Sequence, residues 1–444
     1  MKKLIIFAVI ILAIFLIGAP FVTGKIAETQ ITTMLNQINS SPELTGNNEL
    51  LSYERSAFST HAELRYTLPA AYQTLTDLEY FNYQCHLDHG AIGIDYSCKL
   101  NENSEYQKFI DTYFSGNDPV VMNGEINAFG DITHTISIDE LNDFSLQGSD
   151  DSISMSKSTL TIETDKDLLN HRITGNLDNL TLSSSSESMS ASNLEIDSDI
   201  SKLGDNLFVG DFNAEIKDLQ LTGSGNDINI SGFSIKTNAH ENGKNLESNL
   251  SVSLQELSAP SAAAQVGTIE NVNFTMGVGG LNTEAFSAYQ EFALQAQKQS
   301  LSGNPTQGPA IAPTEMVPYF EAMLQKGFSF EFGITGDLDG NENLIEFDIA
   351  LADALNFGDI MTVALAPETA LGKFNLQLKA KFDEDIVKNN IANSAPPAYF
   401  DYPLLQENNG SYEVDLSINN EIKLNDEVID PQDLQLLLMG DLVR

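Results

Sequence analysis

Apolar and polar residues alternate along most of this chain, and this period of two constrains its fold more than any other feature. From about residue 50 onward, apolar side chains recur at every second position, mostly with Ser, Asn, Asp, Glu or Lys between them. Strict alternation gives a strand one buried and one wet face, as in antiparallel sheets. The clearest runs start at Ile132, Phe212, Leu250, Val272, Phe328, Phe374 and Tyr412. The sequence therefore predicts an α+β protein that is mainly β with a few helices, built on a large, curved antiparallel sheet.

Dipeptides that end in glycine interrupt the alternation and predict turns. They are Asn123-Gly124, Asn242-Gly243, Asp339-Gly340 and Asn409-Gly410, and such pairs favour tight hairpins. Residues 139–235 are rich in Ser, Asn and Asp with only short apolar stretches, which predicts a series of short strands. Within them, the serine-rich residues 183–192 are expected to form a loop.

Helical patterns interrupt the strands and divide the chain. A helix capped by Asn282 is expected to run to about Gln299, and a second one, near Val317–Lys326, to end at Gly327. A third is expected after Asp430, over Asp433–Met439. The predicted parts are a transmembrane anchor, a membrane-proximal helix with a linker, a β-rich region, a helical insertion, and C-terminal β-hairpins with a terminal helix. Their respective ranges are 1–24, 25–48, 49–281, 282–327 and 328–444.

An uncharged apolar run, Leu4–Val22, follows Lys2 and Lys3. Its 19 residues match the length that a helix needs to cross a bilayer, and the two lysines favour a cytoplasmic N-terminus. A cleaved signal peptide is the alternative, but it needs a shorter apolar region and a clean cleavage site, and Pro20 is a poor residue after a cut. We therefore expect a single-pass protein of the bacterial inner membrane whose body lies in the periplasm.

Cys85 and Cys98 are the only cysteines, and they flank a segment rich in turn residues. In an oxidising compartment such as the periplasm, a disulfide that closes this short loop is expected. Two unpaired buried thiols are the alternative. The pair thus agrees with the compartment that the N-terminal segment indicates.

The chain is strongly acidic, with 63 Asp and Glu residues against 22 Lys and Arg residues and a formal net charge of −41. Nucleic-acid binding needs a basic face, so this class of function is excluded. Anionic lipid headgroups are repelled for the same reason. We therefore expect contact with the membrane to be made by the N-terminal helix and not by surface charge.

Sequence motifs for catalysis are missing: there is no nucleophile elbow, no phosphate-binding loop and no metalloprotease motif. Residues 337–343 share a few positions with a calcium loop but lack its glycine and its final glutamate, which favours a hairpin turn. No catalytic residue, cofactor or metal site is therefore expected, and an enzyme with an unrecognised site is the less favoured alternative.

Some of the histidines could serve as metal ligands. His86 and His89 lie close to Asp88 and Cys85, and these residue types could hold a metal on a turn. A disulfide at Cys85 and a turn beginning at His89 are favoured instead. His134 lies between two isoleucines on a predicted strand face, where a hydrogen-bonded core histidine is expected.

Several segments resemble the YdgA-like family of bacterial proteins of unknown function. They are Thr23–Glu28, Tyr53–Thr60, the turn Leu87–Gly90, Asn282–Gln290 and Asn419–Asn425. Asp88, His89 and Gly90 match the family's signature turn, whereas Ser56 stands where glycine is usual and Ala91 replaces a proline. The resemblance implies an inner-membrane anchor and a periplasmic β-rich body, with no catalytic residues. A weaker likeness is to AsmA-like envelope proteins, which have an anchor and a long sheet whose apolar face contacts lipid.

Three functions follow as hypotheses. The first is a non-enzymatic, membrane-tethered envelope protein that binds a lipid or an apolar partner segment on one sheet face, because one-faced strands need cover and few helices are predicted. The second is a structural module that forms homo-oligomers and has no ligand. The third is the enzyme mentioned above.

Overall fold

The computed structural model describes residues 32, 47–56, 58–68, 79–90, 93–100, 111, 120–145, 151–204, 207–223, 227–259, 268–302, 313–356, 358–359, 369, 371–384, 387–388 and 406–431. The predicted anchor, nearly all of the membrane-proximal helix and the predicted helix Asp433–Met439 lie outside these residues. The chain divides into two compact units, Met1–Phe208 and Val209–Arg444, and each is described by itself.

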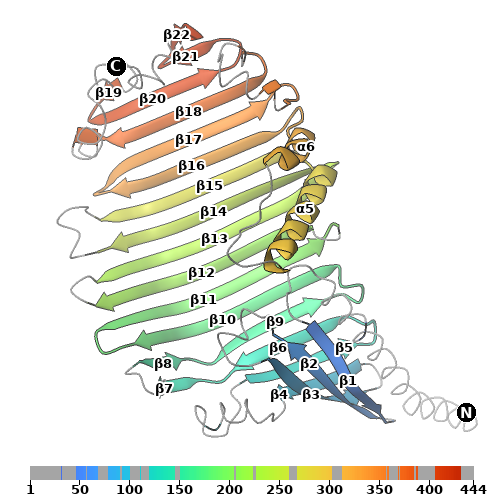
Figure 1. Cartoon of the computed structure of the whole chain (residues 1–444). Helices are drawn as coiled ribbons and strands as arrows, with labels where there is room; N and C mark the ends of the chain where they lie inside the picture. The colour runs from blue at the N-terminus through green and yellow to red at the C-terminus, as the bar shows by residue number, and fades with distance from the viewer. Residues whose placement is uncertain are drawn as a thin grey trace, which may run out of the picture. The chain divides into compact units, whose positions relative to one another are not determined.

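The first unit consists of antiparallel strands (Figure 1). They are β1 (Asn47–Arg55), β2 (Ser59–Thr67), β3 (Tyr80–His89), β4 (Gly93–Leu100), β5 (Val120–Asn127), β6 (Ile132–Ile138), β7 (Leu141–Ser145), β8 (Ser152–Met155), β9 (Ser158–Thr164), β10 (Asn170–Ser183) and β11 (Glu187–Lys202). Strands β1 to β6 pair in chain order, β9 joins β6, and β10 joins β9 and β11. The short β8 pairs with the remainder of β10, and β7 pairs with β8.

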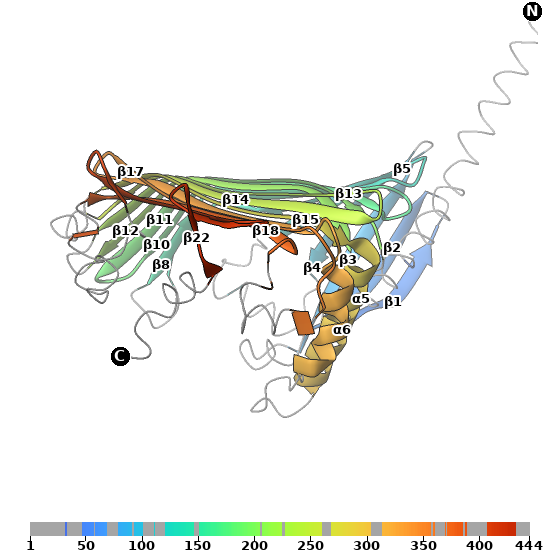
Figure 2. The ribbon, with the colours of Figure 1, turned by 90° about the horizontal axis from the view of Figure 1, so that it is seen from above.

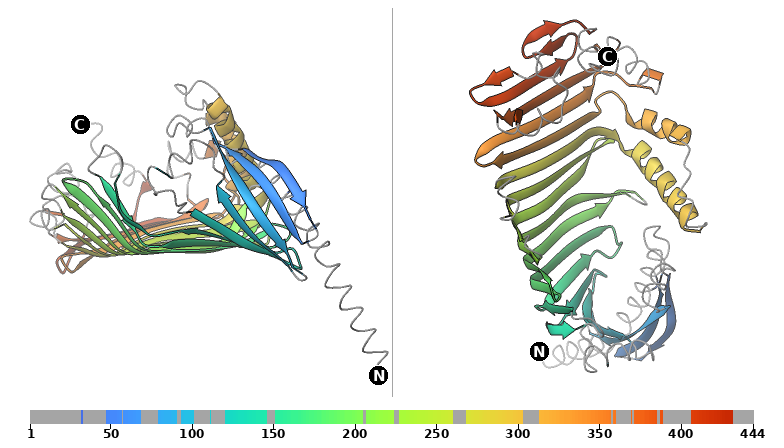
Figure 3. Two further views of the ribbon diagram at one scale, coloured as in Figure 1. Left: turned by 90° about the horizontal axis from the view of Figure 1, so that it is seen from below. Right: turned by 60° about the vertical axis from the view of Figure 1, so that its left-hand side comes forward.

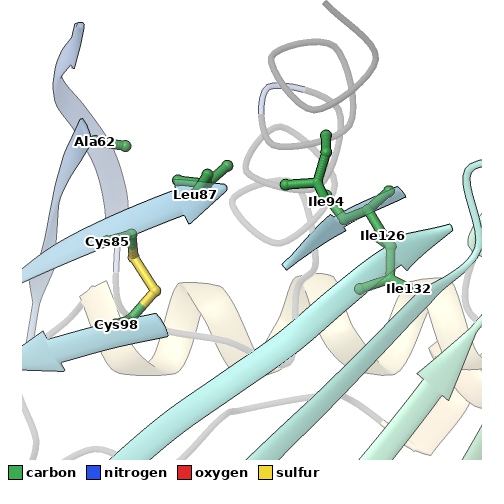
Figure 4. Close-up of a cluster of buried hydrophobic side chains, with 7 residues drawn as sticks. All are labelled: Ala62, Cys85, Leu87, Ile94, Cys98, Ile126 and Ile132. Carbon is green, nitrogen blue, oxygen red and sulfur yellow. A yellow bond between two sulfur atoms is a disulfide. The ribbon is translucent and has the colours of Figure 1, made fainter. Parts of the chain in front are cut away.

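One cluster of buried side chains forms the core of the first unit, where strands β2 to β6 meet (Figure 4). Its members are Ala62, Cys85, Leu87, Ile94, Cys98, Ile126 and Ile132. Leu87 and Ile94 are each only 1% exposed. The disulfide Cys85–Cys98 lies inside this cluster and joins two directly opposite residues of β3 and β4.

The second unit is a second run of antiparallel strands. They are β12 (Phe208–Gly223), β13 (Ile228–Asn242), β14 (Asn245–Ser258), β15 (Ile269–Asn282), β16 (Ser329–Leu338), β17 (Asn341–Leu351), β18 (Phe374–Asp383), β19 (Gln406–Asn408), β20 (Ser411–Ile418), β21 (Ile422–Leu424) and β22 (Glu427–Ile429). Strands β12 to β18 pair in chain order, β20 joins β18, and β19 and β21 each pair with part of β20. Strand β22 pairs with β21.

Helices α5 (Thr283–Ser302) and α6 (Pro313–Met323) interrupt the second unit between β15 and β16. The side-chain oxygen of Asn282 accepts a hydrogen bond from the backbone N–H of Ala285 at 2.9 Å, which caps α5 as predicted. The helices pack through aromatic rings, with the centroids of Phe292 and Tyr319 5.0 Å apart. They leave the sheet at one end of the strands and project from it instead of lying across it (Figures 2 and 3).

The prediction of a mainly β, antiparallel protein with few helices is confirmed for the described residues. The transmembrane helix stays a prediction, since its residues are not among them. In the part of the chain that is described, none of the helices combines the length and the apolar character that a membrane span requires.

The turn predicted at Asn123-Gly124 is wrong, because both residues lie inside β5. The other three dipeptides do lie at turns, where Gly243, Gly340 and Gly410 take φ values of 71°, 82° and 87°. Such left-handed backbone conformations favour glycine. Gly124 instead allows the ring of Tyr96 to approach the backbone of β5 closely.

The predicted series of short strands is confirmed for β7, β8 and β9, which have 5, 4 and 7 residues, but it is wrong for β10 to β13, which are 14 to 16 residues long. Serine and asparagine continue the backbone ladder even where the alternation is weak. The loop expected at residues 183–192 is shorter than predicted and spans residues 184–186, because β11 starts at Glu187.

The second helix starts earlier than predicted, at Pro313. Proline is favoured there because the N–H that it lacks would have no partner in the first turn of a helix. The helix ends at Met323, and Gly327 lies in the turn that follows, where its N–H donates to the carbonyl of Leu351.

Candidate functional site

Three cross-strand rows of mostly apolar side chains lie on one face of the sheet in the second unit, and we call this surface the apolar face. The first row is Phe212, Thr237, Leu250, Met276, Phe332, Phe347, Leu378, Leu416 and Leu424; the second is Ala214, Ile235, Val252, Phe274, Ile334, Ile345, Ala380 and Val414; the third is Ala239, Ser248, Val278, Phe330, Ile349, Leu376, Ile418 and Ile422. Because side chains alternate along a strand, this register brings every member of a row to the same face.

The side chains of these rows in β13 to β17 are at most half-buried. Ile334 is 38% exposed. The aromatic rings on this face contact one another: the centroids of Phe274 and Phe332 are 5.4 Å apart, and those of Phe330 and Phe347 are 6.3 Å apart. The middle of the apolar face thus consists of large side chains that keep part of their surface in water.

Among the described residues, clusters of fully buried side chains lie at two margins of the apolar face. Near the end of α6, Leu351, Leu355 and Phe374 form a buried cluster against which Leu324 and Phe328 pack. At the C-terminal hairpins, the last members of the rows are buried in a second cluster of Leu416, Ile422 and Leu424. These clusters anchor the surface at two sides and leave its middle accessible.

The opposite face of the same strands is polar and carries exposed ion pairs. Lys236 lies 3.2 Å from Glu215, and Lys381 lies 2.9 Å from Glu342. Hydrogen bonds from Asn213 and Lys236 lower the pKa of Glu215, and the bond to Glu342 raises the pKa of Lys381. These two ion pairs thus lie on the face opposite to the apolar rows.

Tyr96 and His134 form a polar contact within the apolar side of the first unit. The register places Tyr96, Gly124 and His134 side by side on β4, β5 and β6. The hydroxyl of Tyr96 lies 2.9 Å from Nδ1 of His134. Burial raises the pKa of Tyr96 and lowers the pKa of His134, so the neutral forms of both groups are favoured and they share this hydrogen bond. The expected core histidine therefore has a partner.

Gly124 makes this contact possible. A Cβ atom at this position would lie 2.2 Å from Cζ of Tyr96, because the tyrosine ring lies over the glycine on its way to His134. A glycine in a strand often marks such a close approach.

The signature turn lies at the end of β3. Asp88 and His89 are the last residues of the strand, and the N–H of the following Gly90 donates to the carbonyl of Gly93 at 2.8 Å. His89 is only 6% exposed, and its Nε2 lies 2.9 Å from the hydroxyl oxygen of Thr60. Its backbone N–H donates to the carbonyl of Phe58, so this histidine joins the β1–β2 and β3–β4 hairpins.

The suggested grouping of His86 with His89 does not occur. Successive strand positions face opposite sides, so His89 points into the core and His86 to the polar surface. His86 instead contacts His61 of β2, with Nδ1 and Nε2 3.1 Å apart, and its other nitrogen lies 3.1 Å from Asp88. The sequence alone does not predict the contact of His61 with His86, because this contact depends on the pairing register of β2 and β3.

A pocket of about 400 Å³ lies beside the two histidines, which we call the polar pocket. It is lined by Ser52, Glu54, His61, Ala62, Glu63, Gln84, Cys85, His86, Ser97 and Lys99. Among the residues with described positions, no three His, Cys, Asp or Glu side chains already surround a common metal position.

Comparison with known families gives one match. The model of a bacterial protein family of unknown function, DUF945, matches residues 1–398. The chain belongs to the DUF945 family. No curated protein and no solved structure matches it significantly. The likeness to YdgA-like and AsmA-like proteins is not confirmed by these comparisons, and the DUF945 family supplies no activity to transfer.

Proposed function

We propose that this protein is a non-enzymatic envelope protein, anchored in the inner membrane, whose second unit binds the acyl chains of a lipid on its apolar face. The observation that carries the proposal is the partly exposed middle of that face, where continuous apolar rows cross strands β13 to β17. Large contiguous apolar surfaces are rare on soluble proteins and mark sites of interaction.

The composition of the face favours an acyl chain over a peptide segment. Apart from Thr237 and Ser248, its side chains carry no hydrogen-bonding group, and the backbone of inner strands is already paired within the sheet. An extended peptide on this surface would bury N–H and C=O groups without partners, which costs about 1–3 kcal/mol for each. An acyl chain has no such groups.

Burial of an acyl chain supplies a free energy comparable to the cost of association. Each methylene removed from water stabilises the complex by about 0.8 kcal/mol. Burial of ten methylenes gives about 8 kcal/mol, which corresponds to a micromolar dissociation constant before the cost of association.

The N-terminal sequence supports a location beside a source of lipid. Leu4–Val22 has the length of a membrane span and follows two lysines. The acidic body would not adsorb to anionic headgroups, so a tether is what would keep it close to the bilayer. The resemblance to YdgA-like and AsmA-like proteins points to the periplasmic side of the inner membrane.

The test compares lipid that co-purifies with the full chain and with two variants that differ in sheet face. Phe332→Gln places an amide on the apolar face, whereas Glu331→Gln changes the neighbouring residue on the polar face. Loss of one buried aromatic side chain costs about 1.5–3 kcal/mol, so Phe332→Gln should lower the apparent affinity by about tenfold or more.

Mass spectrometry of the extracted lipid, per mole of folded protein, checks this expectation. Less lipid with Phe332→Gln and an unchanged amount with Glu331→Gln supports the proposal. Equal amounts in all three proteins contradict it, and so does a wild-type chain that self-associates through this face and carries no lipid.

A further inference from the structure

The histidine pair of the polar pocket has the spacing of two ligands of one metal ion. His61 and His86 are direct cross-strand partners, so both rings stand on the same face of the sheet. Nε2 of His61 and Nδ1 of His86 are 3.1 Å apart. Two nitrogens bound to one tetrahedral ion at 2.0–2.1 Å would be roughly 3.3–3.4 Å apart. We propose that His61 and His86 bind a divalent transition-metal ion of the zinc, nickel or copper class.

Asp88 orients the imidazole of His86 for metal binding. Its carboxylate lies 3.1 Å from Nε2 of His86 and favours the tautomer that carries the proton there. The lone pair of Nδ1 then faces His61. Metal-binding histidines usually have a carboxylate on their second nitrogen, which fixes the tautomer and orients the ring. In the structure the two imidazoles share a hydrogen bond between Nε2 of His61 and Nδ1 of His86. When His61 instead carries its proton on Nδ1, both of these nitrogens have a lone pair. A metal ion can then bind between them in place of the shared proton.

The surroundings leave room for the ion and for further ligands. The side chain of His86 is 46% exposed, and the pocket beside it measures about 400 Å³. The rings must turn to aim both lone pairs at one tetrahedral ion, which half-exposed side chains can do. Glu54 is the cross-strand partner of His61 on β1, so its carboxylate or water can complete the coordination.

Charge favours a cation in this pocket. Two carboxylates, Glu54 and Glu63, line it together with one ammonium group, Lys99. The chain as a whole has a formal charge of −41, which raises the concentration of cations at its surface. Imidazole nitrogen prefers zinc, copper, nickel and iron over calcium or magnesium, which gives the site its selectivity.

The experiment measures zinc binding by calorimetry to the full chain without a histidine tag. His61→Gln and His86→Gln each remove one ligand, and Asp88→Asn removes the carboxylate that orients His86. The matched control is His240→Gln, because His240 is also an exposed strand histidine beside a carboxylate, 3.2 Å from Glu247. Loss of an orienting carboxylate typically weakens binding by about 10- to 100-fold, and loss of a direct ligand should cost at least as much.

The expected result is one zinc ion per chain, weakened about tenfold or more by His61→Gln and by His86→Gln, and unchanged by His240→Gln. Binding of cobalt gives a second readout, since its visible absorption reports tetrahedral nitrogen coordination and should vanish in the same two variants. Zinc affinity that survives both substitutions overturns the proposal, as does an equal loss with His240→Gln.

Discussion

At the scale of the residue, the packing of single side chains explains features that the sequence pattern alone misassigns. Asn123-Gly124 is a favourable turn sequence, yet the pair lies inside β5 because the ring of Tyr96 occupies the space above Gly124. His134 is tolerated among isoleucines because it shares a hydrogen bond with the hydroxyl of Tyr96. Each of these polar or small residues in an apolar surface thus has a partner on a neighbouring strand.

Substitution of Gly124 tests this packing. Gly124→Ala should lower the free energy of unfolding by about 1–3 kcal/mol, because the new methyl group overlaps the tyrosine ring and the carbonyl oxygen of Thr133. Gly175→Ala is the matched control, since the nearest atom there is the flexible end of Leu160 at 3.2 Å. Urea unfolding measures both, and an equal, small effect for the two variants would contradict the packing described here.

The pH dependence of stability tests His134. Burial lowers its pKa in the folded protein below the ordinary value of 6.5, so at lower pH the unfolded state binds more protons. Stability should therefore fall as the pH drops below about 6.5, by at most about 1.4 kcal/mol per pH unit from this group. His134→Gln should flatten that part of the profile. A profile with the same slope in the variant would show that His134 is not responsible.

At the scale of the element, hairpins and helix ends depend on a few specific bonds. The disulfide Cys85–Cys98 closes a loop of 13 residues between β3 and β4. The cap at Asn282 starts α5, and aromatic contacts hold α5 against α6. Since few residues make these connections, each can be tested by one substitution or one pair.

Removal of the disulfide should destabilise the first unit. Replacing both cysteines by alanine frees this 13-residue loop in the unfolded chain and should cost about 3 kcal/mol. Denaturant unfolding of the double variant, compared with the oxidised protein, measures the difference. A double variant as stable as the oxidised protein would exclude a structural role for this bond.

Asn282→Ala removes the cap of α5. The loss should be about 0.5–2 kcal/mol, because the N–H of Ala285 then has no side-chain acceptor. Hydrogen exchange in the first turn of α5 is the direct measurement, and Asn356→Ala, outside the helix, is a control. Unchanged exchange at residues 284–286 would argue against the cap.

The elements were predictable where one physical signal dominates. Alternation located the strands that carry Ile132, Phe274 and Phe332, and Asn282 located the start of α5. Alternation also indicates the part of β12 that starts at Phe212, but the full length of β10 to β13 is not predicted, because serine and asparagine hide the period of two. The contact of His61 with His86 could not be predicted, since it depends on the register between two strands.

At the scale of the whole molecule, the distribution of apolar and charged groups carries the proposed function. The apolar face of the second unit has partly exposed aromatic and aliphatic rows, and the opposite face of the same strands carries ion pairs. A net charge of −41 keeps the chain soluble and opposes adsorption to anionic surfaces. The proposed lipid binding therefore requires a single apolar surface and a tether that brings this surface to the bilayer.

Photo-crosslinking from the apolar face tests this account most directly. A benzophenone amino acid in place of Phe332, in the full chain within its native membrane, should yield adducts with lipid acyl chains on irradiation. The same amino acid in place of Glu331, the next residue on the polar face, should yield none. Lipid adducts from both positions or from neither, or adducts from Phe332 only with protein, would contradict the proposal that this face binds lipid.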